Sequence, residues 1–173
     1  MKKVMISLLF LVPFIAYAQN DKVTEICGVK FGSSISSAKA ILEEKFGEAF
    51  NVSDESIIYC SKSYGGISFD FLAFQFTKSG STTYLNQAAF TVLHKTKTEA
   101  EQERERIAEV LKRKYTLVPR KDSNGDAKYL GGTSPLNSNK CGFVLDISKS
   151  SILDSYPWSA RLIYGGYGYG EEF

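Results

Sequence analysis

Two stretches of the chain carry side chains three and four positions apart on what would be one face of an α-helix. In residues 31–47, this face consists of Ile35, Ala38, Ile41, Leu42, Lys45 and Phe46. In residues 96–115, it consists of Ala100, Ile107, Ala108, Leu111 and Tyr115. Helices of this length are marginal in isolation, so each apolar face should lie against other parts of the chain.

Polar residues mark the ends of both predicted helices. Ser33 or Ser34 can accept a backbone N–H at the start of the first helix, and Gly47 suits the left-handed position after its last turn. The segments 96–99 and 98–101 each fit a Thr-x-x-Glu capping box at the start of the second. Acidic residues crowd the start of this helix and basic residues its end, which indicates a solvated surface complementing the helix dipole.

Elsewhere, apolar residues alternate or run together as they do in β-strands. The pattern predicts strands at 22–30, 57–60, 67–77, 84–94, 115–118, 141–148 and 158–164, and it leaves 51–56 and 129–136 as loops. Asn124-Gly125 is a strong hairpin signal. In the strand at 67–77, either both faces are buried or a bulge between Asp70 and Leu72 exchanges them.

The order of these elements predicts an α+β fold in which two helices pack on one face of an antiparallel sheet. The halves 22–95 and 96–166 also resemble each other, since each has a helix, a glycine pair, a strong strand and a last strand led by tyrosine. Two tandem helix-then-strands repeats would bury a shared core. Chance similarity within an α+β chain is the alternative.

The first eighteen residues have the pattern of a bacterial-type signal peptide. An apolar run follows two lysines and ends in the small-x-small sequence Ala16-Tyr17-Ala18. A membrane anchor is the competing interpretation, but the run is short for a bilayer span and contains Pro13. We therefore expect an exported protein, periplasmic or extracellular, in which residues 19–173 form a single α+β domain that does not span the membrane.

Removal of this signal would change the charge balance. The chain has 21 basic and 19 acidic residues, and two of the basic residues, Lys2 and Lys3, lie in the signal. The mature chain would then be close to neutral, which gives no electrostatic argument for nucleic-acid binding.

The pattern Phe-Gly-Ser-Ser-x-Ser-x-Ala-x-x-x-Leu-x-x-x-Phe-Gly at 31–47 precedes strand-like sequence. It resembles the α+β repeat of exported proteins related to the β-lactamase inhibitor protein and to the small outer-membrane assembly lipoproteins. The resemblance covers mainly this segment and, more loosely, the two-repeat layout. It implies a non-enzymatic protein that binds other proteins through an open sheet face. The chain lacks a lipidation cysteine and has one helix per half, so no site residues are carried over.

Three cysteines, Cys27, Cys60 and Cys141, would remain in the mature chain. An oxidising compartment would allow one disulfide among them and leave one thiol. All three lie in strand-like sequence, so burial as small apolar side chains is the alternative.

Residues with catalytic or metal-binding chemistry are sparse. His94 is the only histidine, and it lies at the end of a predicted strand among threonine and lysine residues. One histidine without a close cysteine pair gives no metal-ligand cluster. Residues 122–126 resemble the start of a calcium loop, but the glycine is misplaced and Thr133 stands where the bidentate glutamate belongs. We therefore predict no catalytic residues, no metal and no cofactor.

Tyr164, Tyr167 and Tyr169 form an aromatic cluster on a glycine-rich tail, which suits contact with a partner. A frayed terminus is the alternative. The function we expect is a non-catalytic binding or accessory protein of the cell envelope, of inhibitor-like type, with another envelope protein as its partner. The alternatives are a polymer-acting hydrolase that uses His94 or paired acids, and a carrier of small apolar ligands built around 69–76.

Overall fold

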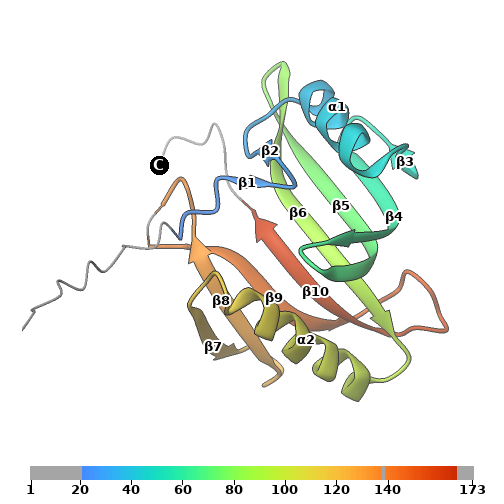
Figure 1. The fold of residues 1–173 in the computed structure, drawn as a ribbon, viewed down its shortest axis with the longest axis vertical. Coiled ribbons are helices and arrows are strands. Elements are labelled where there is room, and N and C mark those ends of the chain that lie inside the picture. The colour runs from blue at the N-terminus through green and yellow to red at the C-terminus, as the bar shows by residue number, and fades with distance from the viewer. Residues whose placement is uncertain (1–20, 138, 167–173) are drawn as a thin grey trace, which may run out of the picture.

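The computed structural model of the protein describes residues 21–137 and 139–166, so the predicted signal peptide lies outside the described residues. Within these ranges the chain forms an α+β fold with two helices and a large antiparallel sheet (Figure 1). In the same part of the chain, neither helix has the length and apolar character needed to cross a bilayer.

The elements of the first half are β1 (Glu25–Ile26), β2 (Val29–Lys30), α1 (Ile35–Phe46), β3 (Asn51–Val52), β4 (Ser56–Tyr64), β5 (Ile67–Ser79) and β6 (Thr82–His94). Those of the second half are α2 (Lys97–Leu111), β7 (Leu117–Lys121), β8 (Ala127–Thr133), β9 (Cys141–Lys149) and β10 (Trp158–Gly165).

Eight of these strands form one sheet in the order β3-β4-β5-β6-β10-β9-β8-β7, and each neighbouring pair is antiparallel. The strands β6 and β10, each the last of its half, pair at the middle of the sheet. There Leu162 lies opposite Phe90 and Ala160 opposite Val92. The strands β1 and β2 form a separate small hairpin.

Local signals begin and end the helices as the sequence predicts. The Ser34 side chain accepts the Ser37 N–H at 3.3 Å at the start of α1, and Gly47 ends this helix with φ 78°. In the capping box of α2, the Glu99 N–H donates to the Thr96 hydroxyl at 3.2 Å, and the Thr96 N–H donates to the Glu99 carboxylate at 3.0 Å.

At the middle of the sheet, the core is formed by rows of strand side chains on one face. Because antiparallel partners point to the same side of a sheet, register assigns whole rows of side chains to a face. One row across five adjacent strands is no more than 2% exposed and consists of Tyr59, Leu72, Phe90, Leu162 and Leu145.

Both helices contribute to this core. Ala38 and Leu42 of α1 and Ile107 and Ala108 of α2 belong to the same cluster as the strand residues. Helix α1 contacts β2, β4 and β6, and α2 contacts β6, β9 and β10 (Figure 1). Ile41, which the helical spacing assigns to the apolar face of α1, is 38% exposed and lies at the margin beside Gly28.

One buried residue of α2 is polar. Arg104 is 6% exposed, and its guanidinium donates to the Ala127 carbonyl at 2.6 Å and to the Glu105 carboxylate at 2.7 Å. The Tyr129 hydroxyl donates to the same carboxylate at 2.7 Å. This network ties α2 to β8, since a buried guanidinium needs its hydrogen bonds satisfied.

Three sequence-based expectations about strands are wrong. Residues 22–30 do not form one strand, because Cys27 and Gly28 adopt positive φ and turn the chain between β1 and β2. Residues 129–136 are not a loop, because β8 runs through Gly131. A Cβ at Gly131 would lie 2.3 Å from the Phe143 ring, so this glycine permits close packing within a strand. The predicted loop at 51–56 begins with the two-residue strand β3.

Strand β5 changes the parity of its buried side chains. Ile67 and Phe69 are buried at one parity, and Leu72 and Phe74 at the other. Between them, Asp70 accepts the Leu93 N–H at 2.7 Å in place of a regular backbone pair. The parity of the buried side chains therefore changes between Phe69 and Leu72. The predicted bulge does not lie there, because β5 keeps one register with β4 along this segment, and its register with β6 shifts between Gln75 and Phe76 instead.

Candidate functional site

An unbroken apolar row crosses seven adjacent strands at positions that do not belong to the core cluster. Register places its members side by side, and we call them the apolar stripe: Ile58, Ala73, Ala89, Ile163, Val144, Leu130 and Val118. Strands in a sheet lie about 4.8 Å apart, so six intervals make the stripe about 29 Å long.

The stripe differs from the core rows in its exposure. Val118 is 38% exposed, and the other six residues are half-buried. Within the described part of the chain, the core cluster contains none of the seven. A contiguous apolar row left partly in contact with water is typical of an interaction site, whereas isolated exposed apolar residues are not.

More polar rows flank the stripe. On one side lie Ser56, Gln75 and Gln87, which are opposite one another in the register. On the other side, Arg161 makes a bidentate pair with Asp146, with nitrogen–oxygen distances of 2.9 and 2.8 Å. An apolar centre with a polar rim is the usual anatomy of a protein–protein interface.

Basic residues gather at the β7–β8 end of this face. Arg120 lies opposite Lys128 in the register, at the same parity as Val118 and Leu130 of the stripe. The hairpin that holds them is closed by the predicted Asn124-Gly125 turn, in which Asp122 accepts the backbone N–H groups of residues 124 and 126. Both bonds end on the same Asp122 carboxylate oxygen, which therefore stabilises the turn. Among the described residues, no group of three or more His, Cys, Asp or Glu side chains could hold a metal ion.

The three cysteines are free thiols in the structure. Cys27 is buried in the β1–β2 turn, Cys60 is half-buried on β4, and Cys141 is half-buried at the start of β9. Burial raises the pKa of the Cys27 thiol to about 12, and nearby Lys45 opposes this rise. Cys27 is therefore protonated near neutral pH and is a poor nucleophile.

His94 ends β6 opposite Trp158 of β10. Its Nε2 is buried and has no hydrogen-bond partner among the described residues. A catalytic histidine needs a nucleophile within hydrogen-bond reach. The hydrolase alternative therefore has no supporting contact at His94 within the described chain.

Tyr164, the first member of the predicted tail cluster, is 5% exposed. Its ring packs against Phe90 and Phe143 at centroid distances of 5.7 and 5.4 Å. Tyr164 is therefore a core residue on β10 and does not belong to an exposed aromatic cluster. Tyr167 and Tyr169 lie outside the described residues. Any partner contact by the tail would therefore depend on these two tyrosines.

Sequence reasoning did not single out the apolar stripe. On β5 and β6 consecutive residues are apolar, as in Leu72 beside Ala73 and Phe90 beside Ala89, so the sequence does not separate a core face from an exposed face. The signal available in the sequence was the recurrence of Ala, Val and Ile at the other parity of several strands. Its meaning depends on strand order, which places these residues in one row.

No protein-family model, no curated protein and no solved structure matches this chain. The geometry of the stripe and its surroundings is therefore the basis for assigning a function.

Proposed function

We propose that the protein is an exported, non-catalytic binding protein that holds another protein against the apolar stripe. The observation that carries this proposal is the row of seven apolar side chains from Ile58 to Val118, which is half-exposed and about 29 Å long. A sheet face of this extent suits an interface of standard size, about 800 Å² on each partner.

The partner should combine an apolar ridge with carboxylates at one end. The ridge would cover the stripe, and the carboxylates would face Arg120 and Lys128. Charges at the edge of an interface mainly steer and orient the encounter, while the buried apolar centre supplies most of the affinity.

The proposed architecture is two tandem repeats whose helices cover one face of the sheet. The order α1-β3-β4-β5-β6 matches the order α2-β7-β8-β9-β10, and β6 pairs antiparallel with β10 at the middle. This arrangement suits a pseudo-twofold axis between the two strands. Burial of Leu42 and Ile107 in one core cluster supports placement of both helices on the same side.

Export supplies the setting for this function. The proposed signal peptide at residues 1–18 would deliver the chain to the periplasm or the exterior, where the partner would be another envelope protein. Detection of a mature N-terminus at Gln19 by mass spectrometry of the secreted or periplasmic fraction tests this step. A chain that retains Met1 in the cytoplasm would contradict it.

Site-specific photo-crosslinking tests the stripe. A photoreactive phenylalanine analogue replaces Val118 at the end of the stripe, and a matched variant carries it at Leu153, which is exposed to a similar degree but lies in the β9–β10 loop. We expect one defined protein adduct from position 118 and none from position 153. The adduct identifies the partner, which is then purified for affinity measurements.

Substitutions within the stripe then test whether it provides the affinity. Ile163→Glu and Val144→Glu place charge on the half-buried row, and Ile152→Glu is the control because Ile152 is 51% exposed in the β9–β10 loop. We expect at least a tenfold loss of affinity for the first two and no loss for the control, with thermal unfolding confirming that all three are folded. Equal affinity for folded stripe variants and wild type would refute the proposal.

A further inference from the structure

A cavity of about 620 Å³ lies at one end of the sheet, between the β7–β8 turn, the last residues of β9 and the first residues of β10. Pairing between β8 and β9 ends at Tyr129 and Leu145. Two residues before Tyr129, the Ala127 carbonyl accepts a hydrogen bond from the Arg104 guanidinium of α2 at 2.6 Å. The β7–β8 turn therefore separates from β9 at this end. None of the apolar-stripe residues lines the cavity, so it is distinct from the proposed protein-binding surface.

Trp158, the first residue of β10, gives the cavity an aromatic wall. The side chain is half-buried, and the Lys97 ammonium lies 5.6 Å from its ring centroid. Lys97 does not line the cavity, so it leaves the part of the ring that faces the cavity open. An indole ring offers a flat apolar surface together with one N–H donor. Buried Ile147 adds further apolar surface.

The carboxylates around the cavity already have partners within the chain. Asp146 forms the bidentate pair with Arg161, and Asp126 pairs with Lys97. Asp122 accepts the two backbone N–H groups of the turn. An ionised carboxylate has about four lone-pair sites, so each of these groups can still accept hydrogen bonds from a ligand while its present bonds remain.

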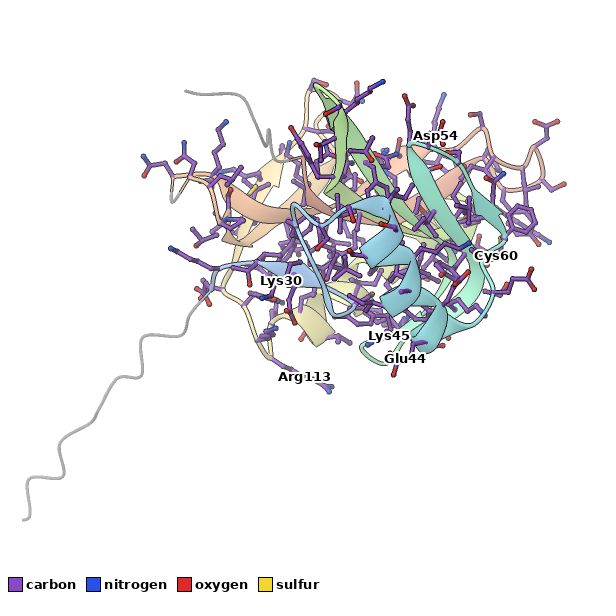
Figure 2. All side chains as sticks on the ribbon, turned by 90° about the horizontal axis from the view of Figure 1, so that it is seen from above. Lys30, Glu44, Lys45, Asp54, Cys60 and Arg113 are labelled. Atoms are coloured by element: carbon purple, nitrogen blue, oxygen red, sulfur yellow. The ribbon has the colours of Figure 1, made fainter. Side chains whose placement is uncertain are left out.

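The charges at the cavity nearly cancel. Its lining carries three aspartates against one arginine and Lys149, and the Lys97 ammonium balances the remaining negative charge. The exposed charges labelled on α1 in Figure 2, Glu44 and Lys45, do not line the cavity, and neither does Arg113 after α2. A charged ligand would therefore meet no net opposite charge. A neutral ligand with many hydroxyl groups could use the paired side chains without separating them.

The size and lining of the cavity suit a sugar. Small-molecule sites usually have volumes of about 300–1,000 Å³, and 620 Å³ leaves room for one or two sugar rings. A pyranose ring has a face of C–H groups and an edge of hydroxyls, which can contact an indole ring and neighbouring polar groups together. Asn124 and Ser148 add an amide and a hydroxyl to the lining.

We infer that this cavity binds a neutral saccharide of one or two hexose units. The C–H face of one ring would lie against Trp158. Its hydroxyls would donate to Asp126 and Asp146 and accept from Arg161. This ligand is additional to the protein partner proposed for the apolar stripe.

Fluorescence of the wild-type protein tests the inference directly, because Trp158 is the only tryptophan of the chain. The mature protein is titrated at pH 7 with the neutral disaccharides cellobiose, maltose and lactose, and with sorbitol, which carries hydroxyls but no ring. We expect at least one disaccharide to change the emission with a Kd of about a millimolar or tighter, and sorbitol to leave it unchanged. No response to any disaccharide, or an equal response to sorbitol, would overturn the assignment.

Calorimetric titration of variants tests the aromatic wall. Trp158→Leu removes the flat ring and should weaken binding by about tenfold, whereas Trp158→Phe should retain part of the affinity. Tyr156→Leu is the matched control, because Tyr156 is half-buried in the neighbouring β9–β10 loop and does not line the cavity. Wild-type affinity in folded Trp158→Leu would overturn the assignment, as would an equal loss in the control.

Substitution of the carboxylates tests the polar groups. Asp126→Asn and Asp146→Asn should each weaken binding by about fivefold or more, because hydrogen bonds to a charged acceptor are lost. Asp154→Asn is the control, since Asp154 is exposed in the β9–β10 loop and does not line the cavity. Unchanged affinity in both folded cavity variants would contradict the assignment. Thermal unfolding establishes that each variant is folded, and the wild-type titrations decide the question for any variant that is not.

Charged sugars test the neutral class. Glucuronate and glucosamine should each bind more weakly than glucose, and galacturonate and galactosamine more weakly than galactose, for whichever hexose the binding disaccharide contains. Tighter binding of a charged form would overturn the neutral assignment. These titrations contain no protein partner, so their outcome is independent of the photo-crosslinking result for the apolar stripe.

Discussion

The difference between the two faces of the sheet can be measured with one pair of substitutions, Phe90→Ala and Phe71→Ala. Phe90 is fully buried, and its ring contacts four others at centroid distances of 5.3–5.8 Å: Tyr64, Phe69, Phe74 and Tyr164. Phe71 lies on the neighbouring strand β5, is half-buried, and belongs to the row beside the apolar stripe. The two substitutions remove the same atoms from opposite faces.

The expected costs differ by several kcal/mol. Truncation of a buried Phe to Ala costs about 3–5 kcal/mol because it removes apolar burial and leaves a cavity. The four ring contacts of Phe90 favour the upper part of that range. Phe71 loses only partial burial and leaves no enclosed cavity, so we expect about 1 kcal/mol for its truncation.

Urea unfolding monitored by circular dichroism measures both values. The midpoint should fall far more for Phe90→Ala than for Phe71→Ala, while the slope with denaturant stays constant in both. Equal losses for the two variants would refute the assignment of Phe71 to a partly solvated face. The apolar stripe would then need to be buried by something else.

Three further predictions concern a helix cap, a thiol and a strand glycine. The pKa of Glu99 is lowered, first by the hydrogen bond from the Thr96 backbone, so the stabilisation that this carboxylate gives should be present at neutral pH and lost as the pH falls below 4.5. Glu99→Gln should flatten this part of a curve of Tm against pH, and an unchanged curve would contradict the cap. A pKa of about 12 leaves roughly one Cys27 thiol in ten thousand ionised at pH 8, so an alkylating reagent should modify Cys60 much sooner than Cys27, as measured by mass spectrometry. Preferential labelling of Cys27 would contradict its burial. Gly131→Ala should cost about 1–3 kcal/mol because its Cβ would overlap the Phe143 ring; the combined variant with Phe143→Leu should recover part of the loss, and no loss in the single variant would contradict the close packing.

The helices were predictable because their signals are local. The apolar spacing, the serine at the start of α1, Gly47 at its end and the Thr96–Glu99 capping box each involve residues fewer than five positions apart. Their free energy does not depend on distant parts of the chain. Arg104 was not predicted as a buried member of α2, because its partner on β8, the Ala127 carbonyl, is 23 residues away.

Glycine and strand parity limited the remaining predictions. The pair Gly131-Gly132 suggests a turn in the sequence, yet Gly131 lies within β8, where the Phe143 ring occupies the space that a side chain would fill. The turn at Cys27 was also missed, since a non-glycine residue seldom adopts positive φ. The candidate binding face could not be found from local alternation, because only the register across strands places Ala89, Ile163 and Val144 in one row.

The margins of the sheet have a consequence for self-association. An open strand with unpaired N–H and C=O groups can recruit another chain, and short strands, proline, bulges and lysine discourage this. One margin is the two-residue strand β3, beyond which β4 carries Ser61 at φ 51° and then Lys62. The other margin, β7, contains Pro119. Strand-by-strand growth into aggregates is therefore disfavoured at both margins, and the protein can leave an apolar surface accessible to a partner without polymerising through its backbone.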